Sequence, residues 1–323
     1  MPAGDLMCFD CYILLTDYSR DESEFSRYLL HAKVDAMEKF LNLDKFIEGE
    51  KNSLEEIKSY YRINEWAYKH FHSQDGFMHF RISQNGCFTD EDVYHQPDAV
   101  SQFIKKGDLV MELGYGQGAN LLYLAHSHPD AQFYGVDLAP LKQKDIPSNV
   151  RTFQIDYSNL SQFEDNSVDV AYAFETIVHN TDKEKIYKEV CRVLKPGGRL
   201  IIYDYALSAS FSTFDTHTQQ AIALISKGCA SAMIESLDEL NAHYTNSGLD
   251  LESNTDYSMN TLPDLKRLER KAAKILTRPM VARLMFWLFP EQFVTNIIVG
   301  YLGYDSCKSG VITYQEWVLR KPC

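Results

Sequence analysis

Short apolar runs alternate with helical patterns between residues 100 and 206. Runs of strand length lie at 109–113, 132–136, 151–155, 168–173 and 199–204, and apolar residues recur at helical spacing near 119–127 and 182–194. Strands that alternate with helices are typical of a parallel sheet with helices on both faces. The pattern therefore predicts an α/β fold with a Rossmann-like, doubly wound and mostly parallel sheet. Residues 194–198 are expected to form the turn into the fifth strand.

The rest of the sequence predicts additions to this sheet. Helical spacing in the first part indicates an N-terminal helical arm and lid at 1–98, ahead of a ligand-binding core at 99–206. Residues 207–310 are interpreted as a cap insertion, helical with loops at 211–258 and with a basic helix at 262–277. Residues 311–323 begin with many β-forming residues and are expected to return to the sheet as its last strand.

One segment of the cap, residues 281–304, is strongly apolar. Pro290 and Glu291 interrupt it, and neither half reaches the roughly 20 residues that a membrane-spanning helix needs. We therefore expect this segment to bury an apolar face over the ligand site, with Phe286 and Trp287 in contact with a hydrophobic acceptor. Contact with a membrane surface is the alternative.

A glycine-rich loop follows the first strand of the core. Gly114, Gly116 and Gly118 are spaced by two, and a helical pattern begins near Ala119. Such glycines let the backbone turn tightly and approach a ligand at the N-terminus of the helix. The loop alone fits NAD, FAD and S-adenosylmethionine, so it predicts a nucleoside ligand without choosing among the three.

Acidic residues lie at the ends of four strands. Glu112 precedes the glycines, Asp137 ends the second strand, Asp156 follows the third and Glu175 follows the fourth. Because the carboxyl ends of parallel strands line one crevice, the four should converge, although capping of the next helix could explain any one of them. Glu112 would repel a pyrophosphate and attract a ligand with an ammonium and a sulfonium, while Asp137 can accept the hydroxyls of an adenosine ribose. The acids therefore favour S-adenosylmethionine.

Charge and composition limit the kinds of partner that the protein is expected to bind. The net charge of -13 opposes binding to a nucleic acid, and an apolar content of 45% is ordinary for a globular protein. Seven scattered cysteines, and histidines without metal-ligand spacing, predict reduced thiols and no metal. We expect a cytoplasmic protein, either free or peripheral to a membrane, and composition leaves a homo-oligomer open.

Three motifs resemble the class I S-adenosylmethionine-dependent methyltransferases. They are Glu-Leu-Gly-Tyr-Gly-Gln-Gly at 112–118, Gly-Val-Asp-Leu at 135–138 and Arg-Val-Leu-Lys-Pro-Gly-Gly at 192–198. Within that class, Phe-Glu-Thr-Ile-Val-His at 174–179 is similar to the Glu-x-x-x-His motif of the C-methyltransferases that act on sterol side chains. Gly-Phe-Met-His-Phe at 76–80 and Trp-Val-Leu-Arg-Lys-Pro at 317–322 are also similar to that group. The class resemblance covers about 60–205 and 311–322, and the second helix of the core is reduced to 139–145.

The residue patterns and the resemblance together indicate roles for individual residues. Contacts with S-adenosylmethionine are expected from Tyr61, Glu112, Gly114, Gly116, Gly118, Asn120, Asp137, Leu138, Asp156, Tyr157 and Glu175. Glu175 and His179 are the acid and base candidates, and Glu175 could instead only hold the cofactor. Acceptor contacts are expected from Tyr60, Tyr68, Phe71, His79, Phe286 and Trp287. The aromatic segment around 60–80 is interpreted as a lid over the donor or as plain core packing.

The leading hypothesis is a methyltransferase that acts on a carbon of an apolar isoprenoid, terpenoid or sterol-like small molecule. The first alternative is an N- or O-methyltransferase of a smaller polar metabolite, which would need a compact polar pocket. The second is a non-catalytic scaffold that kept the fold, and the intact glycines and Asp137 argue against it.

Overall fold

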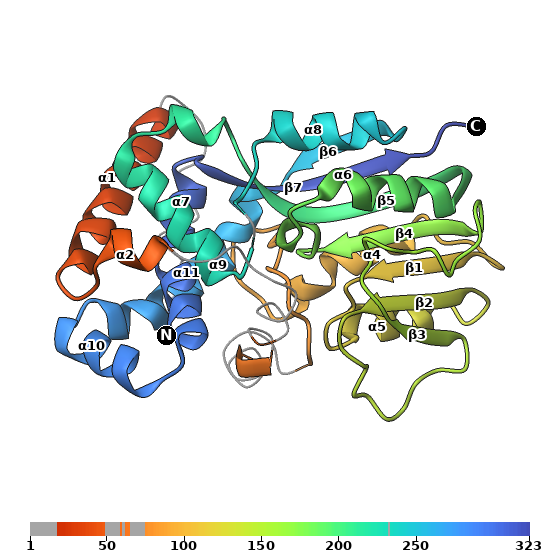
Figure 1. Ribbon diagram of the computed structural model, residues 1–323, viewed down its shortest axis with the longest axis horizontal. Coiled ribbons are helices and arrows are strands. Elements are labelled where there is room, and N and C mark those ends of the chain that lie inside the picture. Colours follow the sequence, from red (N-terminus) through yellow and green to blue (C-terminus); the bar gives the residue numbers. More distant parts are fainter. Residues whose placement is uncertain (1–17, 49–58, 60–61, 65–74, 232) are drawn as a thin grey trace, which may run out of the picture.

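A seven-stranded sheet forms the centre of the protein. The computed structural model describes residues 18–48, 59, 62–64, 75–231 and 233–323 (Figure 1). The strands follow the order β3-β2-β1-β4-β5-β7-β6, in which β1 to β5 pair in parallel and β7 is antiparallel to both of its neighbours. This arrangement confirms the predicted Rossmann-like, mostly parallel α/β fold. The strands are β1 (Leu109–Leu113), β2 (Gln132–Asp137), β3 (Val150–Gln154), β4 (Val168–Phe174), β5 (Leu194–Leu207), β6 (Asp250–Asp256) and β7 (Ile312–Arg320).

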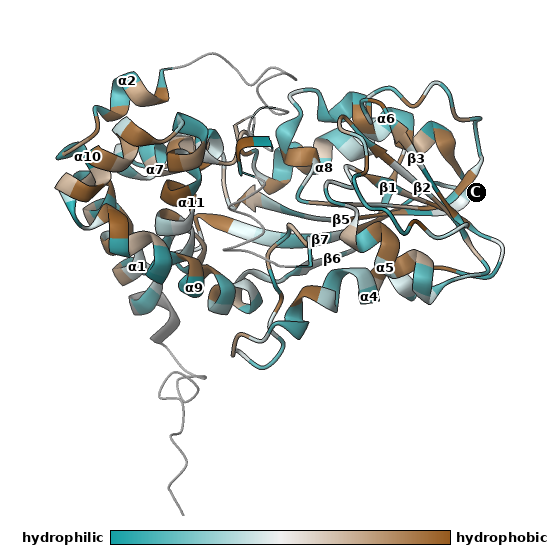
Figure 2. Cartoon of the chain, turned by 90° about the horizontal axis from the view of Figure 1, so that it is seen from below, coloured by the Kyte–Doolittle hydropathy of each residue, from teal (hydrophilic) through white to brown (hydrophobic). Residues whose placement is uncertain are grey.

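Helices cover both faces of this sheet. The helices beside it are α4 (His95–Ser101), α5 (Ala119–Ser127), α6 (Lys183–Val193) and α8 (Leu237–Asn246), with short 3-10 turns η3 (Glu91–Tyr94) and η4 (Ile177–His179). Figure 2 shows α6 and α8 on one side of the strands and α4 and α5 on the other. Because side chains alternate along a strand, Val110 of β1 packs in one hydrophobic cluster with Leu121, whereas Met111 packs in the other with Ile186. Two apolar faces therefore hold the sheet between two helical layers.

The remaining helices form a cap beyond one end of the sheet (Figure 1). They are α1 (Tyr18–Glu38), α2 (Leu43–Ile47), α7 (Thr216–Gly228), α9 (Ser258–Leu276), α10 (Pro279–Leu288) and α11 (Glu291–Lys308), with the turn η5 (Phe211–Thr213) leading into α7. Lys33 of α1 forms ion pairs with Glu269 of α9 at 2.5 Å and with Asp305 of α11 at 2.6 Å. Segments far apart in the sequence thus form one helical unit, which faces the carboxyl ends of the parallel strands.

Two expectations about secondary structure are wrong. Residues 250–256, expected to be helix or loop, form the edge strand β6, whose seven residues are all exposed. Their polar sequence lacks the apolar alternation that signals a strand, and pairing with β7 supplies the order instead. Residues 194–198, expected to be a turn, already belong to β5, which reaches Val168 at Leu194 and resumes its pairing with a register shift at Arg199. The last strand at 311–319 is confirmed as β7.

Candidate active site

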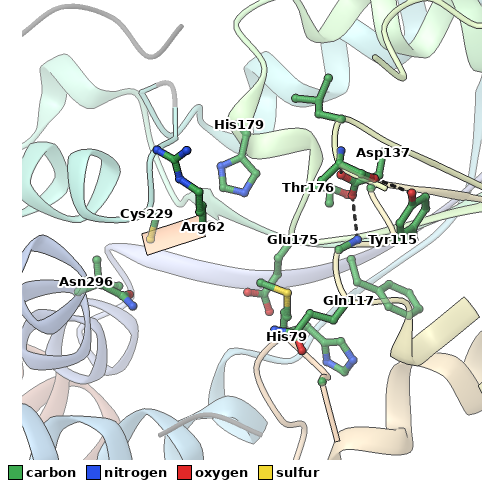
Figure 3. Close-up of a pocket in the computed structure, with 18 of the residues that line it drawn as sticks. Arg62, His79, Tyr115, Gln117, Asp137, Glu175, Thr176, His179, Cys229 and Asn296 are labelled. Atoms are coloured by element: carbon green, nitrogen blue, oxygen red, sulfur yellow. Dashed lines mark hydrogen bonds between the residues drawn. The ribbon is translucent and has the colours of Figure 1, made fainter. Parts of the chain in front are cut away.

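A cavity of about 1320 Å³ lies between the carboxyl ends of the parallel strands and the cap. Gly114, Gly116 and Gln117 of the glycine loop line one part of it. Leu268 and Ile275 of α9 line another, together with residues of α10 and α11. Figure 3 shows Glu175 in the middle of this view, with Asp137 to one side and Asn296 of α11 to the other. The cavity therefore joins a nucleotide-type loop to an apolar compartment.

The glycine loop has the strained backbone that its sequence predicts. Gly114 has a φ of +76°, and a Cβ there would lie 2.3 Å from Cγ2 of Thr176. Gly118 is the N-cap of α5, with a φ of +83°, and a Cβ there would lie 2.4 Å from Cδ1 of Leu141. Only glycine fits both positions without a shift of the neighbours. Gly118 shapes the loop without lining the cavity, while the predicted contact Asn120 does line it.

All four predicted acids line the same cavity. Glu112, Asp137, Asp156 and Glu175 come from the ends of β1, β2, β3 and β4. Asp137 accepts hydrogen bonds from the backbone N–H of Gly116 at 2.8 Å and of Ala139 at 2.9 Å, which fix its carboxylate against the glycine loop. The prediction that these acids converge is confirmed, and four carboxyl groups around one space suit a cationic ligand.

Glu112 is buried beneath the loop. Its side chain is 2% exposed, and Oε2 accepts a hydrogen bond from the hydroxyl of Tyr172 at 3.1 Å. Burial raises the pKa of the Glu112 carboxyl to about 8, because removal from water penalises the charged form. A positive charge bound nearby would favour ionisation and lower this pKa. The site therefore has an electrostatic preference for a ligand with an ammonium or sulfonium group.

Two further residues predicted to contact the cofactor, and His79, which was predicted to contact the acceptor, also line the cavity. Leu138 and Tyr157 line it, and the hydroxyl of Tyr157 donates a hydrogen bond to the carbonyl oxygen of Thr176 at 2.8 Å. His79 also lines the cavity, and its Nε2 lies 3.1 Å from Oδ1 of Asn120. This bond joins the segment before the sheet to the first turn of α5, so His79 positions that segment as well as lining the cavity.

Glu175 stands at the junction of the two parts of the cavity. Its φ of +52° is in the left-handed region, which non-glycine residues rarely adopt and which marks strain at functional positions. Oε1 accepts hydrogen bonds from the backbone N–H of Phe80 at 2.6 Å and from the hydroxyl of Tyr314 at 2.9 Å. Burial nevertheless raises the pKa of the carboxyl to about 8. A carboxyl with this pKa is mostly protonated at neutral pH and can act as a base once it is ionised, which a nearby positive charge favours.

His179 lies one turn beyond Glu175, at the end of η4. Its Nδ1 is 3.1 Å from the carbonyl oxygen of Ala230, and burial lowers the pKa of the imidazole to about 4. The ring is therefore neutral at physiological pH and cannot donate a proton as an imidazolium. It remains available as a polar contact or as a weak base, and Figure 3 shows it beside Arg62 and Cys229 in the cap half of the cavity.

The remaining predicted contacts with the cofactor and the acceptor divide into two groups. Tyr60, Tyr61, Tyr68 and Phe71 lie outside the described residues, so the lid stays a prediction. Phe286 and Trp287 were expected at the acceptor, but neither residue lines the cavity. Phe286 packs against Phe40 and Phe46, and Trp287 is 80% exposed. Their neighbours Met285 and Phe289 line the cavity instead, because successive residues of a helix point about 100° apart.

Several residues of the site were not predicted from the sequence. Tyr314 of β7 reaches Glu175 across 139 positions of the sequence, and Tyr205, Cys229 and Asn296 add polar atoms to the cavity. No local motif points to them, because only the pairing of β7 with β5 and the packing of the cap bring them to the site. The helical spacing of Phe293 and Ile297 on α11 is a signal that could have indicated an apolar wall.

Comparisons with known proteins agree with this geometry. Residues 111–202 match the methyltransferase domain family. The 27-O-demethylrifamycin SV methyltransferase of Amycolatopsis mediterranei is 29% identical over 50% of this chain and 60% of its own length. The sterol 24-C-methyltransferase of Schizosaccharomyces pombe is 27% identical over 65% of this chain and 57% of its own length. The matches thus span less than two thirds of each of these relatives.

Solved structures show the same fold over most of the protein. A cyclopropane synthase from Mycobacterium tuberculosis has a TM-score of 0.66 at 13% identity, covering 84% of this protein and all of that one. A geranyl diphosphate C-methyltransferase from Streptomyces coelicolor has a TM-score of 0.57 at 15% identity, covering 81% and 98%. At this identity the likeness concerns the fold alone. The family match over residues 111–202, together with the fold, the glycine loop and the converging acids, shows a methyltransferase domain with the class I fold, and the chain resembles the sterol C-methyltransferase group.

Proposed function

We propose that the protein transfers a methyl group to a carbon of an apolar isoprenoid, terpenoid or sterol-like acceptor. One observation carries the proposal: the cofactor loop and a large apolar compartment share a single cavity, with Glu175 at their junction. Sequence relatives that include sterol 24-C-methyltransferases support the same acceptor class.

The residues present fit the cofactor. Gly114 and Gly116 let the backbone line the cavity without side chains, Asp137 presents a fixed carboxylate, and Glu112 favours a nearby positive charge. When bound, S-adenosylmethionine supplies an electrophilic methyl group on a sulfonium. The protein then has to align donor and acceptor and exclude water, and alignment of this kind can lower a barrier by ~7–11 kcal/mol.

The apolar compartment suits a hydrocarbon acceptor. It is lined by Leu268 and Ile275 of α9, by Met285 of α10, and by Phe293 and Ile297 of α11. Each methylene group moved from water into such a compartment contributes about 0.8 kcal/mol, so an isoprenoid acceptor needs few polar anchors. A cavity of about 1320 Å³ exceeds what a small metabolite requires beside the cofactor.

Glu175 is the proposed base. An alkene carbon of the acceptor would form a bond to the methyl group while the bond from that methyl group to the donor sulfur breaks, with its electron pair left on sulfur. The neighbouring carbon of the acceptor then becomes electron-deficient, and loss of a proton from an adjacent carbon restores a double bond. The carboxylate of Glu175 takes that proton. Hydrogen bonds from the hydroxyl of Tyr314 and the N–H of Phe80 hold the carboxylate in place. Neutral His179 and Asn296 would orient the polar end of the acceptor.

A methyl transfer to oxygen is the second candidate, because two of the sequence relatives are O-methyltransferases by name or by substrate. Turnover measured with a panel of acceptors distinguishes methyl transfer to carbon from methyl transfer to oxygen. Turnover of prenyl alcohols and side-chain-unsaturated sterols, with no turnover of small phenols or amines, supports the proposal. The opposite preference assigns the site to the second candidate.

A further inference from the structure

Helix α10 presents an apolar stripe to solvent. Met280 is 85% exposed, Leu284 51%, Trp287 80% and Leu288 55%. The first three are spaced by four and three residues, so they lie on one side of the helix. We call these four residues the α10 patch. A cluster of large apolar side chains on one exposed helix face marks an interaction surface. Figure 2 shows α10 at the outer end of the cap, away from the sheet.

The stretch of sequence that carries the α10 patch is basic. Residues 271–290 contain no aspartate or glutamate, although the whole protein has 45 acidic residues and a net charge of -13. The same stretch holds Lys271, Lys274, Arg278 and Arg283, all of which are exposed. An exposed tryptophan and leucines flanked by lysine and arginine are the pattern of a helix that lies in a membrane interface.

Among the described residues, none of the helices has both the length and the apolar character needed to cross a bilayer. We propose that the α10 patch and its basic border dock the protein peripherally on a membrane that contains anionic phospholipids. The apolar side chains enter the interface, and Lys274 and Arg278 pair with the negative surface. A protein of this overall charge would otherwise be repelled by such a surface, so the local reversal of sign decides which face approaches.

The position of α10 indicates that docking delivers a lipophilic acceptor to the cavity. This inference rests on the function proposed above. Met285 and Phe289, on and just after the same helix, line the cavity. The helix therefore separates the bilayer from the acceptor compartment by its own width. A lipophilic acceptor dissolved in the membrane could pass along α10 into the cavity without crossing water.

Vesicle binding tests the docking itself. The full-length protein, without donor or acceptor, is sedimented with phosphatidylcholine vesicles that contain or lack phosphatidylglycerol. We expect binding to the anionic vesicles, weakening with salt, and a shift of tryptophan fluorescence that Trp287→Phe removes. Removal of charge by Lys274→Gln or Arg278→Gln should weaken binding about fivefold each.

Leu284→Ser should weaken binding about tenfold or more, because it removes an apolar side chain that docking buries in the membrane interface. Leu251→Ser on β6 is the matched control, since Leu251 is 45% exposed but lies on the sheet. Equal melting temperatures confirm that both variants fold.

Absence of vesicle binding, or equal losses in Leu284→Ser and Leu251→Ser, would overturn the proposal. A dimer in light scattering that Leu284→Ser dissociates, with no vesicle binding, would also overturn it and assign the patch to a second copy. Methyl transfer to a detergent-dispersed acceptor is measured separately, so failure of docking and failure of the proposed function are distinguishable.

Discussion

The hydroxyl of Tyr314 donates a hydrogen bond to Oε1 of Glu175 at 2.9 Å, which links the last strand of the sheet to the motif at the end of β4. Phe80 adds a second donor to the same oxygen at 2.6 Å. Glu175 is thereby held from two other parts of the sequence, and its strained backbone persists because the surroundings fix it.

Glu175→Gln should reduce turnover by about 10²- to 10⁴-fold, the usual contribution of a general base, while cofactor binding persists. Since the base must be ionised and burial raises its pKa to about 8, kcat/KM of the natural enzyme should rise as pH increases through that value. The rise should vanish in the variant. Full turnover in Glu175→Gln would reduce Glu175 to a cofactor contact.

Tyr314→Phe tests positioning at the same carboxyl. Loss of the hydroxyl removes a bond that favours the charged form, so the pKa of Glu175 should move higher and the pH limb should shift to the alkaline side. Activity should recover at high pH. A uniform loss of activity at every pH would show that Tyr314 acts only through folding.

Binding of S-adenosylmethionine should release protons near neutral pH. Glu112 and Glu175 both have pKa values raised to about 8 by burial, so both are mostly protonated before a cation arrives. The sulfonium favours their ionised forms, whereas S-adenosylhomocysteine lacks that charge. Calorimetry in buffers of different ionisation heat should show more proton release with the charged ligand. Equal release with both ligands would mean that neither carboxyl senses the sulfonium.

Asp137→Ala should weaken cofactor binding by about 1–3 kcal/mol, because it leaves buried hydrogen-bonding groups without a partner. The effect should be similar for S-adenosylmethionine and S-adenosylhomocysteine, since both share the ribose. Calorimetry with NAD serves as the control. Tight NAD binding without a response to S-adenosylhomocysteine would contradict the cofactor assignment.

Phe293→Ala and Ile297→Ala should raise KM for long-chain acceptors far more than for short ones, because both side chains line the apolar compartment. The expected loss of binding free energy for a long-chain acceptor is about 1.5–3 kcal/mol for each side chain removed. Met259→Ala, at a position 63% exposed on α9, is the control. Unchanged chain-length preference in both cavity variants would remove the acceptor from this compartment.

Much of the core could be predicted from the sequence. The five parallel strands and the last strand follow from short apolar runs, and the convergence of the four acids follows from the rule that parallel strands end on one side. Gly114 and Gly118 identify their own turns, because a side chain there would meet Thr176 or Leu141.

Other parts depend on contacts that no local pattern records. Residues 250–256 are polar throughout and become strand only by pairing with β7. Helix α10 is apolar on most of its circumference, so its sequence does not tell which residues face the cavity. Phe286 and Trp287 are therefore predicted at the acceptor, although Met285 and Phe289 are the residues that line the cavity. Tyr314 reaches Glu175 only through the assembled sheet.

The most direct test of carbon methylation uses a donor labelled with carbon-13 in its methyl group and an acceptor with a side-chain double bond. Mass spectrometry would detect the labelled product, and nuclear magnetic resonance would show the atom to which the labelled methyl is bonded. We expect a methyl group on carbon, a shifted or retained double bond, and about 10²- to 10⁴-fold slower formation of this product with Glu175→Gln. A labelled methyl group found only on oxygen or nitrogen would contradict methyl transfer to carbon.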